Sequence, residues 1–430
     1  MKNKDHTKGL LIILIILLVF CTLLYISQEN QKAEKSDTIA TREGQNRIIL
    51  SWWGNDERHK YTMEGVDHFM EENPEIHVNC RYGEWNGFEK RMEVWTNSHN
   101  EADVMQINYA WLDTYSKDGT GYYDLNQLSE YINLDAFSDK CKEYGTRNGH
   151  LNALPIAMNS QVFYYNQDIL DQYGLSCPEN WDDLFEMAEV VSKDGKYLLG
   201  MSKKQVFMLL IAYYEQSTGK AMFNDDGKLA ASKDEIAELL VFYKKMIDEH
   251  VLCPVDIFDN AMYQNGQVVG IMCWISDTKK YRDALEEKGV KVSLCLYPMM
   301  EGAKRSGWYI KPATMWAISA DTKSPKDAAV LLEYLLNDPY MVSLAGTEKG
   351  VPVSSKAVEV LSENGLSETN EYIATEEINK RADEINIIIP NIEKEAIIDA
   401  FKQNADEYLY DRMDADECAE LIYDSIIEVQ

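Results

Sequence analysis

Apolar and polar positions alternate in blocks over the first part of the chain, and these blocks predict strands and helices in turn. Apolar runs at residues 47–53, 76–82 and 103–107 have the length of buried strands. Residues 61–71 and 88–96, which lie between them, have the mixed pattern of helices that cover a sheet. This alternation is typical of an α/β fold in which helices cover parallel strands.

The length of the chain predicts two lobes. A single core stops growing at roughly 250 to 300 residues. The chain has 430 residues, of which 45% are apolar. Helix starts are also marked further along, because Ser232 and Glu235 form a capping-box pattern and Ser324 stands before Pro325. We therefore expect two globular lobes, each with a core of its own.

The residues that directly follow the predicted strands are the candidates for a binding site. Parallel sheets bind ligands beyond the carboxyl ends of their strands, so these positions meet at one edge. Here they are rich in tryptophan and asparagine. The candidates are Trp53, Asn55 and Asp56 after residues 47–53, Asn108, Tyr109 and Trp111 after residues 103–107, Asn159 after residues 154–158, and Trp274 after residues 268–273.

Three further tryptophans bear on the site. Trp52 and Trp53 are neighbours on one strand and point to opposite faces, so one is expected in the core and the other at the site. The pattern leaves open which is which. Trp308 precedes an apolar run at residues 314–319 and is a further candidate ligand contact, while Trp85 is expected at the rim.

The charge balance restricts the class of partner. The chain has 42 basic and 72 acidic residues, a formal net charge of −30. Such a surface repels phosphate backbones, which argues against a nucleic-acid partner and favours a neutral or cationic ligand. The seven histidines are dispersed without metal-binding spacing, and no cofactor motif is present, so neither a metal nor a cofactor is expected.

The N-terminus predicts export and membrane attachment. Lys2, Lys4 and Lys8 precede an apolar stretch at residues 10–26. We assign residues 1–27 to a signal or membrane anchor and residues 28–46 to a flexible tether. Residues 18–21 are similar to a lipobox, which makes Cys21 the candidate for lipidation. Lipid attachment and an uncleaved signal helix both remain open.

The other cysteines are scattered without a C-x-x-C pair. Their odd number and irregular spacing predict buried thiols in apolar segments rather than a disulfide framework. They are Cys80, Cys141, Cys177, Cys253, Cys273, Cys295 and Cys418.

Four segments together carry a resemblance to a known family. They are residues 50–54 with 69–78, residues 153–159 continuing to 164–166 and Trp181, residues 265–272 with Trp274, and residues 315–319 through Pro352. In this order and spacing, the chain resembles the extracellular solute-binding proteins of the maltose-binding type, family 1 of the ABC-importer receptors.

The resemblance implies a type II periplasmic-binding-protein fold, with a sugar cleft between two lobes joined by a hinge. It places crossings near Ala157, Lys291 and Ser324. The N-terminal lobe is then residues 47–156 and 292–323, and the C-terminal lobe is residues 157–291 and 324–430. The partners it implies are a small carbohydrate and the permease subunits of an ABC importer, with the protein a monomer on the outer face of the bacterial cytoplasmic membrane.

The chemistry of sugar capture fits the candidate residues independently of the resemblance. An aromatic ring covers the C–H face of a pyranose, and amide or carboxylate groups hydrogen-bond its hydroxyls. Trp274 stands where the family places a stacking aromatic. Two alternatives remain open: a glycoside hydrolase, and a carbohydrate sensor or adhesion module that feeds no transporter. Because no catalytic motif is present, we expect binding without catalysis.

Overall fold

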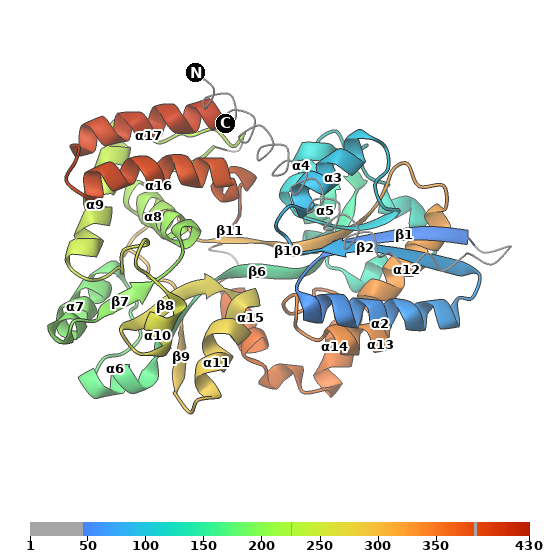
Figure 1. Ribbon diagram of the computed structural model, residues 1–430, viewed down its shortest axis with the longest axis horizontal. Helices are drawn as coiled ribbons and strands as arrows, with labels where there is room; N and C mark the ends of the chain where they lie inside the picture. Colours follow the sequence, from blue (N-terminus) through green and yellow to red (C-terminus); the bar gives the residue numbers. More distant parts are fainter. Residues whose placement is uncertain (1–45, 225, 382–384) are drawn as a thin grey trace, which may run out of the picture.

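The computed structural model describes residues 46–224, 226–381 and 385–430, which form two lobes lying side by side (Figure 1). The alternation predicted for the first lobe is confirmed. It consists of β1 (Asn46–Trp53), α2 (Asp56–Glu72), β2 (Ile76–Gly83), α3 (Phe88–Asn97) and β3 (Val104–Ile107). Strand β1 lies between β2 and β3 and is parallel to both.

The rest of the chain supplies the second lobe, returns to the first at residues 325–345 and ends in the second. After α4 (Ala110–Tyr115), α5 (Asp139–Gly145) and the short pair β4 (Thr146–Arg147) and β5 (His150–Leu151), the second lobe contains α6 (Gln167–Tyr173), α7 (Trp181–Val191), β7 (Tyr197–Gly200), α8 (Lys203–Thr218), α9 (Lys233–Asp248), α10 (Asn260–Gln264), β8 (Val268–Trp274), α11 (Ala284–Glu286) and β9 (Val292–Cys295). The C-terminal part contains α12 (Pro325–Asn337), α13 (Pro339–Ala345), α14 (Ser355–Glu363), α15 (Asn370–Asn379), β11 (Asn386–Ile387), α16 (Glu395–Leu409) and α17 (Ala415–Val429).

Two long strands, β6 (Ala153–Asn166) and β10 (Tyr309–Ile318), pass through both lobes. They run antiparallel to each other. Beyond this pairing, β6 continues into the second lobe and pairs with β8 and β9. The strand order of the sheet is β2-β1-β3-β10-β6-β8-β7. The predicted two-lobed α/β fold is confirmed, and these two strands form the hinge.

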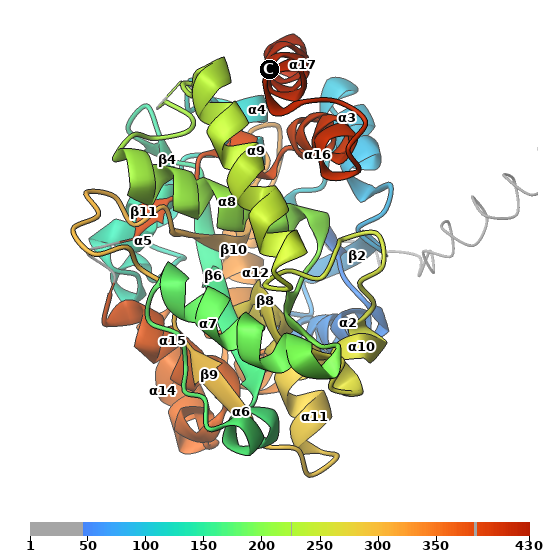
Figure 2. The same ribbon diagram turned by 90° about the vertical axis from the view of Figure 1, so that its left-hand side faces the viewer.

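The first lobe has an apolar core on each face of its sheet, and adjacent residues of β1 enter different cores. Trp52 packs into one core with Leu332 of α12, and Trp53 packs into the other with Phe88 and Trp111. The second lobe has one large core around α8. Figure 2 shows α16 and α17 side by side at one end of this lobe, close to α9.

Two segments lie in the lobe opposite to the one expected. Strand β9 pairs with β6, and Val292 and Cys295 are buried in the core of the second lobe, although residues 292–323 were assigned to the first. Helix α12 lies in the first lobe, where Leu331 and Leu332 are buried, although residues 324–430 were assigned to the second. The reason is that the chain returns to the first lobe through β10, after β9 and before α12.

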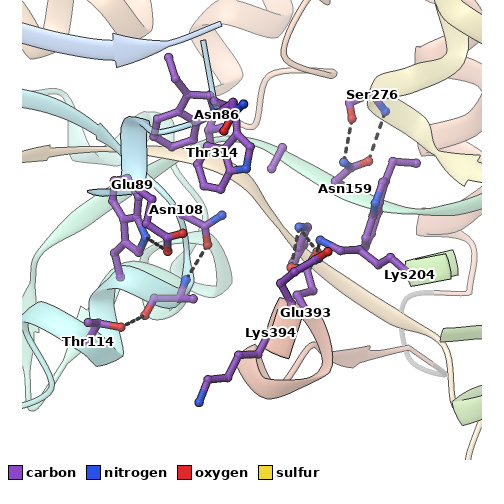
Figure 3. Close-up of a pocket in the computed structure, with 18 of the residues that line it drawn as sticks. Asn86, Glu89, Asn108, Thr114, Asn159, Lys204, Ser276, Thr314, Glu393 and Lys394 are labelled. Carbon is purple, nitrogen blue, oxygen red and sulfur yellow. Dashed lines mark hydrogen bonds and ion pairs between the residues drawn. The ribbon is translucent and has the colours of Figure 1, made fainter. Parts of the chain in front are cut away.

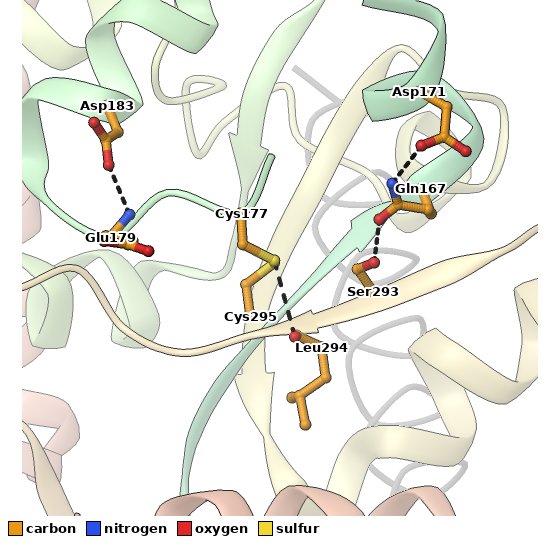
Figure 4. The surroundings of a disulfide bond; sticks show 8 residues. All are labelled: Gln167, Asp171, Cys177, Glu179, Asp183, Ser293, Leu294 and Cys295. Atoms are coloured by element: carbon orange, nitrogen blue, oxygen red, sulfur yellow. Dashed lines mark hydrogen bonds between the residues drawn. A yellow bond between two sulfur atoms is a disulfide. The ribbon is translucent and has the colours of Figure 1, made fainter. Parts of the chain in front are cut away.

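The second lobe contains a disulfide bond between Cys177 and Cys295 (Figure 4). It links the segment between α6 and α7 to β9, across 118 residues of sequence. The expectation of unpaired thiols is wrong for these two cysteines, since their pairing depends on a strand contact that spacing does not reveal. Among the described residues, the cysteines at positions 80, 141, 253, 273 and 418 are unpaired.

The predicted anchor lies outside the described residues. These begin at Asn46, so residues 1–27 with Cys21, and the tether except for its last residue, are not part of the description. Within the described ranges, every helix is too short or too polar to span a bilayer.

Candidate functional site

A cleft of about 1230 Å³ lies between the lobes and is lined by both (Figure 3). The first lobe contributes the ends of β1 and β3, the turn before α3, and the start of α4. The hinge strands form its floor, and the second lobe contributes the end of β8 and residues 391–396. The cleft therefore opens at the carboxyl ends of β1, β3 and β8, as expected for a sheet of this kind.

Three tryptophans form the first-lobe wall. The ring of Trp85 lies 5.0 Å from that of Trp53 and 6.1 Å from that of Trp111, measured between centroids. Trp53 and Trp111 are buried, whereas Trp85 is 45% exposed. The indole N–H of Trp111 donates to Glu89 Oε1 over 3.3 Å. The buried pair thus supports one accessible ring, which is suited to cover the apolar face of a ligand.

The second-lobe wall combines one tryptophan with a charged cluster. Trp274 stands at the end of β8, and Lys311 Nζ lies 4.5 Å from its ring centroid. Lys311 donates to both carboxylate oxygens of Glu393 at 2.6 Å, and Lys204 Nζ lies 3.7 Å from the same carboxylate. Burial lowers the pKa of Lys311, and Glu393 opposes that effect.

The hinge carries polar groups that face the cleft. Asn159 of β6 donates to Ser276 Oγ over 2.9 Å and accepts from the Ser276 backbone N–H over 3.3 Å (Figure 3). Its amide therefore ties the hinge to the turn after β8. Burial raises the pKa of Asp277 in the same turn. The hydroxyl of Thr314 in β10 is buried and has no hydrogen-bond partner among the described residues, so it is available to a ligand.

Two basic side chains line the cleft on the first-lobe side. Lys349, in the turn between α13 and α14, donates to Gln106 Oε1 over 2.7 Å. Burial, and to a lesser degree Arg58, lower the pKa of Lys349 to about 7. Arg58 of α2 donates through Nη2 to the backbone carbonyl of Glu348 over 2.5 Å. Both cations are held by neutral acceptors.

Five of the nine predicted ligand residues line the cleft. Three of them lie at or directly after strand ends, one lies within β6 and one lies in α4, so the site brings together segments that are far apart in sequence. Asn108 also shapes the turn before α4, where its Oδ1 accepts from the Ala110 backbone N–H over 2.9 Å. The five are Trp53, Asn108, Trp111, Asn159 and Trp274.

The other four predicted residues do not line it. Asn55 caps α2 by accepting from the Arg58 backbone N–H, and Asp56 is exposed in the first turn of that helix, where the dipole favours an acid. Tyr109 packs under the guanidinium of Arg147.

Trp308 belongs to the core of the second lobe, which corrects its assignment as a ligand contact. Its ring stacks on Tyr297 at 5.0 Å, and its indole N–H donates to the carbonyl of Pro298 over 3.3 Å. The physical reason is its position: Trp308 precedes β10, whereas the cleft lies at the ends of β1, β3 and β8.

No sequence pattern indicated the charged residues that line the cleft. These residues come from separate helices, a strand and turns, and they meet only in the folded chain. They are Arg58, Lys204, Lys311, Lys349 and Glu393. Trp85, expected at the rim, lies just after β2 and so follows the same strand-end rule as Trp53. Across the described ranges, no group of His, Cys, Asp and Glu side chains could hold a metal ion.

Comparisons with known proteins agree with this geometry. Residues 64–375 match the family of bacterial extracellular solute-binding proteins. A probable ABC transporter-binding protein of Deinococcus radiodurans is 21% identical over 254 residues, which are 55% of this chain and 58% of that protein. The chain thus spans somewhat more than half the length of this relative.

Two solved structures cover nearly the whole of the described chain. A periplasmic oligogalacturonide binding protein from Yersinia enterocolitica, in complex with saturated digalacturonic acid, is 30% identical, with a TM-score of 0.79 over 89% of this chain and 98% of that one. A de novo designed cysteine esterase is also 30% identical, with a TM-score of 0.80 over 90% and 98%.

Proposed function

Because the chain belongs to the family of bacterial extracellular solute-binding proteins, we propose that it captures an oligosaccharide in the cleft and delivers it to the permease subunits of an ABC importer. The observation that carries this proposal is the pair of aromatic walls, with Trp85 on the first lobe and Trp274 on the second. A ligand that contacts both walls binds the closed form better than the open form and so drives closure of the lobes.

The size of the cleft supports a ligand of more than one ring. Small-molecule pockets typically have volumes of about 300 to 1000 Å³. A cleft of about 1230 Å³ leaves room for an oligosaccharide. Sugar hydroxyls would meet Asn108 and the unpaired hydroxyl of Thr314.

Calorimetric titration of the purified protein against a panel of neutral and acidic oligosaccharides tests the proposal. The Yersinia protein supplies the first probe, digalacturonic acid. We expect at least one member of the panel to bind in a one-to-one ratio. Failure of every saccharide to bind or to raise the melting temperature would contradict the proposal.

The rival proposal is a glycoside hydrolase, which needs a free acid and a second carboxylate beside the scissile bond. Asp277 is buried and its pKa is raised, so it is the candidate acid in the cleft. The other acids of the lining are engaged: Glu393 by two lysines, Glu89 by Trp111, Asp113 by Arg147 and Glu395 by Lys203. Among the described lining residues, Asp277 therefore lacks a free second carboxylate. These contacts favour binding without turnover. Chromatography of the ligand after long incubation decides the point, because a hydrolase would return shortened sugars.

We place the protein on the outer face of the cytoplasmic membrane, held by residues 1–27. This rests on the apolar stretch behind Lys8 and on the extracellular family. Cell fractionation of the wild type and of Cys21→Ser tests it. Retention of both forms supports an uncleaved helix, release of the variant alone supports a lipid on Cys21, and release of both contradicts anchoring.

A further inference from the structure

The charge of the cleft differs from that of the chain as a whole. The whole chain has 42 basic and 72 acidic residues. In the cleft lining, basic side chains are at least as frequent as acidic ones. The basic ones are Arg58, Lys90, Lys204, Lys311, Lys349 and Lys394, and the acidic ones are Glu89, Asp113, Asp277, Glu393 and Glu395.

Lys349 is a buried ammonium group at the cleft surface. Its side chain is 8% exposed, and Nζ lies 4.9 Å from the ring centroid of Trp316. The ammonium donates one hydrogen bond to Gln106 Oε1, and within the described chain Lys349 forms no ion pair. Moving a charge out of water without a counter-ion is costly, so a lysine in this position is poorly compensated in the ligand-free protein.

Arg58 adds a second cation beside it. The proximity of Arg58 helps to lower the pKa of Lys349. The Nε atom of Arg58 is buried and has no hydrogen-bond partner among the described residues. The neighbouring carboxylate of Glu348 is taken by an ion pair with Lys279. Across the cleft, Asp277 is also in electrostatic reach of Arg58, but burial opposes its ionisation.

We propose that Arg58 and Lys349 bind a carboxylate of the ligand, so that the protein captures an acidic, uronate-containing oligosaccharide. The inference rests on the proposed function and adds the charge class of the ligand. A carboxylate matches the forked guanidinium and accepts from the ammonium as well, and hydrogen bonds between ionised groups are about twice as strong as neutral ones. It reverses the expectation of a neutral or cationic ligand, which the overall charge of the chain had suggested.

The position of the two cations suits a sugar acid rather than a free inorganic anion. Trp53 and Trp85, whose rings pack together, line the first-lobe side of the cleft, as Arg58 and Lys349 do. A pyranose ring on the aromatic wall and its carboxylate on the cations can therefore be bound together. Lys349 also lies close to the hinge strand β6, because Pro352, three residues later, forms an isolated β-bridge with Ala157.

Titration with digalacturonic acid and with its methyl ester, which keeps the rings and removes the charge, tests the inference. We expect the wild type to bind the acid at least about tenfold more tightly than the ester. Lys349→Met and Arg58→Gln should each reduce that preference without weakening ester binding. Lys60→Met, an exposed lysine on the same helix as Arg58 and outside the cleft, should leave the preference unchanged.

The outcomes separate this inference from the proposed function. Equal affinity for acid and ester, or an equal loss of both in Lys349→Met, would overturn the carboxylate site. Binding of neutral oligosaccharides alone would overturn it too, while leaving the proposed function intact. Binding of no saccharide would overturn both. Thermal melts show whether each variant is folded. If Lys349→Met does not fold, the ratio of acid to ester affinity in Arg58→Gln tests the carboxylate site.

Discussion

On the first-lobe wall of the cleft, Arg58 and Lys349 have no acidic partner among the described residues, and three indole rings pack together. On the second-lobe wall, two lysines share Glu393 and one indole ring lies beside Lys311. Charge on the second wall is satisfied within the protein, whereas charge on the first is left for a ligand. Residue type alone therefore does not mark a binding group. What marks it is an interaction that the folded chain leaves unmade.

The largest expected effect is on the first wall. Trp85→Ala removes the accessible ring, and loss of such an aromatic anchor typically weakens binding by about 2 kcal/mol, or about thirtyfold. Because Trp85 is 45% exposed, we expect the melting temperature of the ligand-free protein to change little. Calorimetry and thermal melts measure the two quantities. An unchanged affinity would show that Trp85 does not stack on the ligand.

Trp274→Ala should have a smaller effect, about tenfold in affinity. Trp274 is half-buried, and the ammonium of Lys311 already lies over its ring, so less of the ring is open to a ligand. The same titration series measures the effect. A loss greater than that of Trp85→Ala would reverse the ranking of the two walls.

Binding of an acidic ligand should also weaken as the pH rises through about 7. A carboxylate prefers the protonated form of Lys349, whose pKa burial lowers to about 7, so affinity is highest below that pH and falls above it by up to about tenfold per unit. The groups around Lys349 are Arg58, His59 and Gln106, and burial lowers the pKa of His59 below its ordinary value. Titrations between pH 6.5 and 8.5 therefore report on Lys349, and Lys349→Met should abolish the slope.

The same lysine should affect stability in the opposite direction. The pKa of Lys349 is lower in the folded protein than in the unfolded chain, so the unfolded chain binds more protons between about pH 7 and 10. The contribution of Lys349 to the free energy of unfolding therefore becomes more favourable to the folded state as pH rises. Any stability gained by Lys349→Met in the ligand-free protein should therefore shrink over this range. Denaturant melts of wild type and variant at pH 7 and 9 measure the difference. A constant difference would argue against a titrating lysine.

The smallest effect is expected from Glu393→Gln, which removes the acid that Lys311 and Lys204 share. The freed lysines should increase affinity for an acidic ligand by only about threefold, because burial lowers the pKa of Lys311 further once Glu393 no longer opposes it. The buried ammonium of Lys311 then lacks its counter-ion, so the melting temperature should fall. A stable variant with unchanged affinity would mean that the second wall contributes no charge to binding.

Local pattern predicted the elements of the first lobe but not the path of the chain between lobes. The strand at residues 76–82 is observed as Ile76–Gly83, and the helix at residues 88–96 as Phe88–Asn97, because periodicity and length determine both. The rule that ligands meet strand ends placed Trp53, Asn108 and Trp274 at the cleft. The lobes predicted for β9 and α12 were wrong. The lobe in which each element lies depends on where β6 and β10 carry the chain from one lobe to the other, and local pattern does not show this.

The unpaired cations could not be predicted from the sequence. Arg58 lies in a helix whose exposed positions are commonly charged, and Lys349 lies in a turn nearly 300 residues away. Their role depends on burial and on missing partners, which are properties of the folded chain. The net charge of −30 was also misleading, since it describes the surface and not the cleft.

The tryptophan cluster gives the protein an optical signal of its own. Four of the nine tryptophans, Trp53, Trp85, Trp111 and Trp274, line the cleft, and the first three are close enough to exchange excitation energy. The most exposed of these rings, Trp85, is the one that a ligand would shield from water. Ligand entry should therefore shift the intrinsic fluorescence to shorter wavelength, so that the unlabelled protein can serve as a sensor for its own ligand.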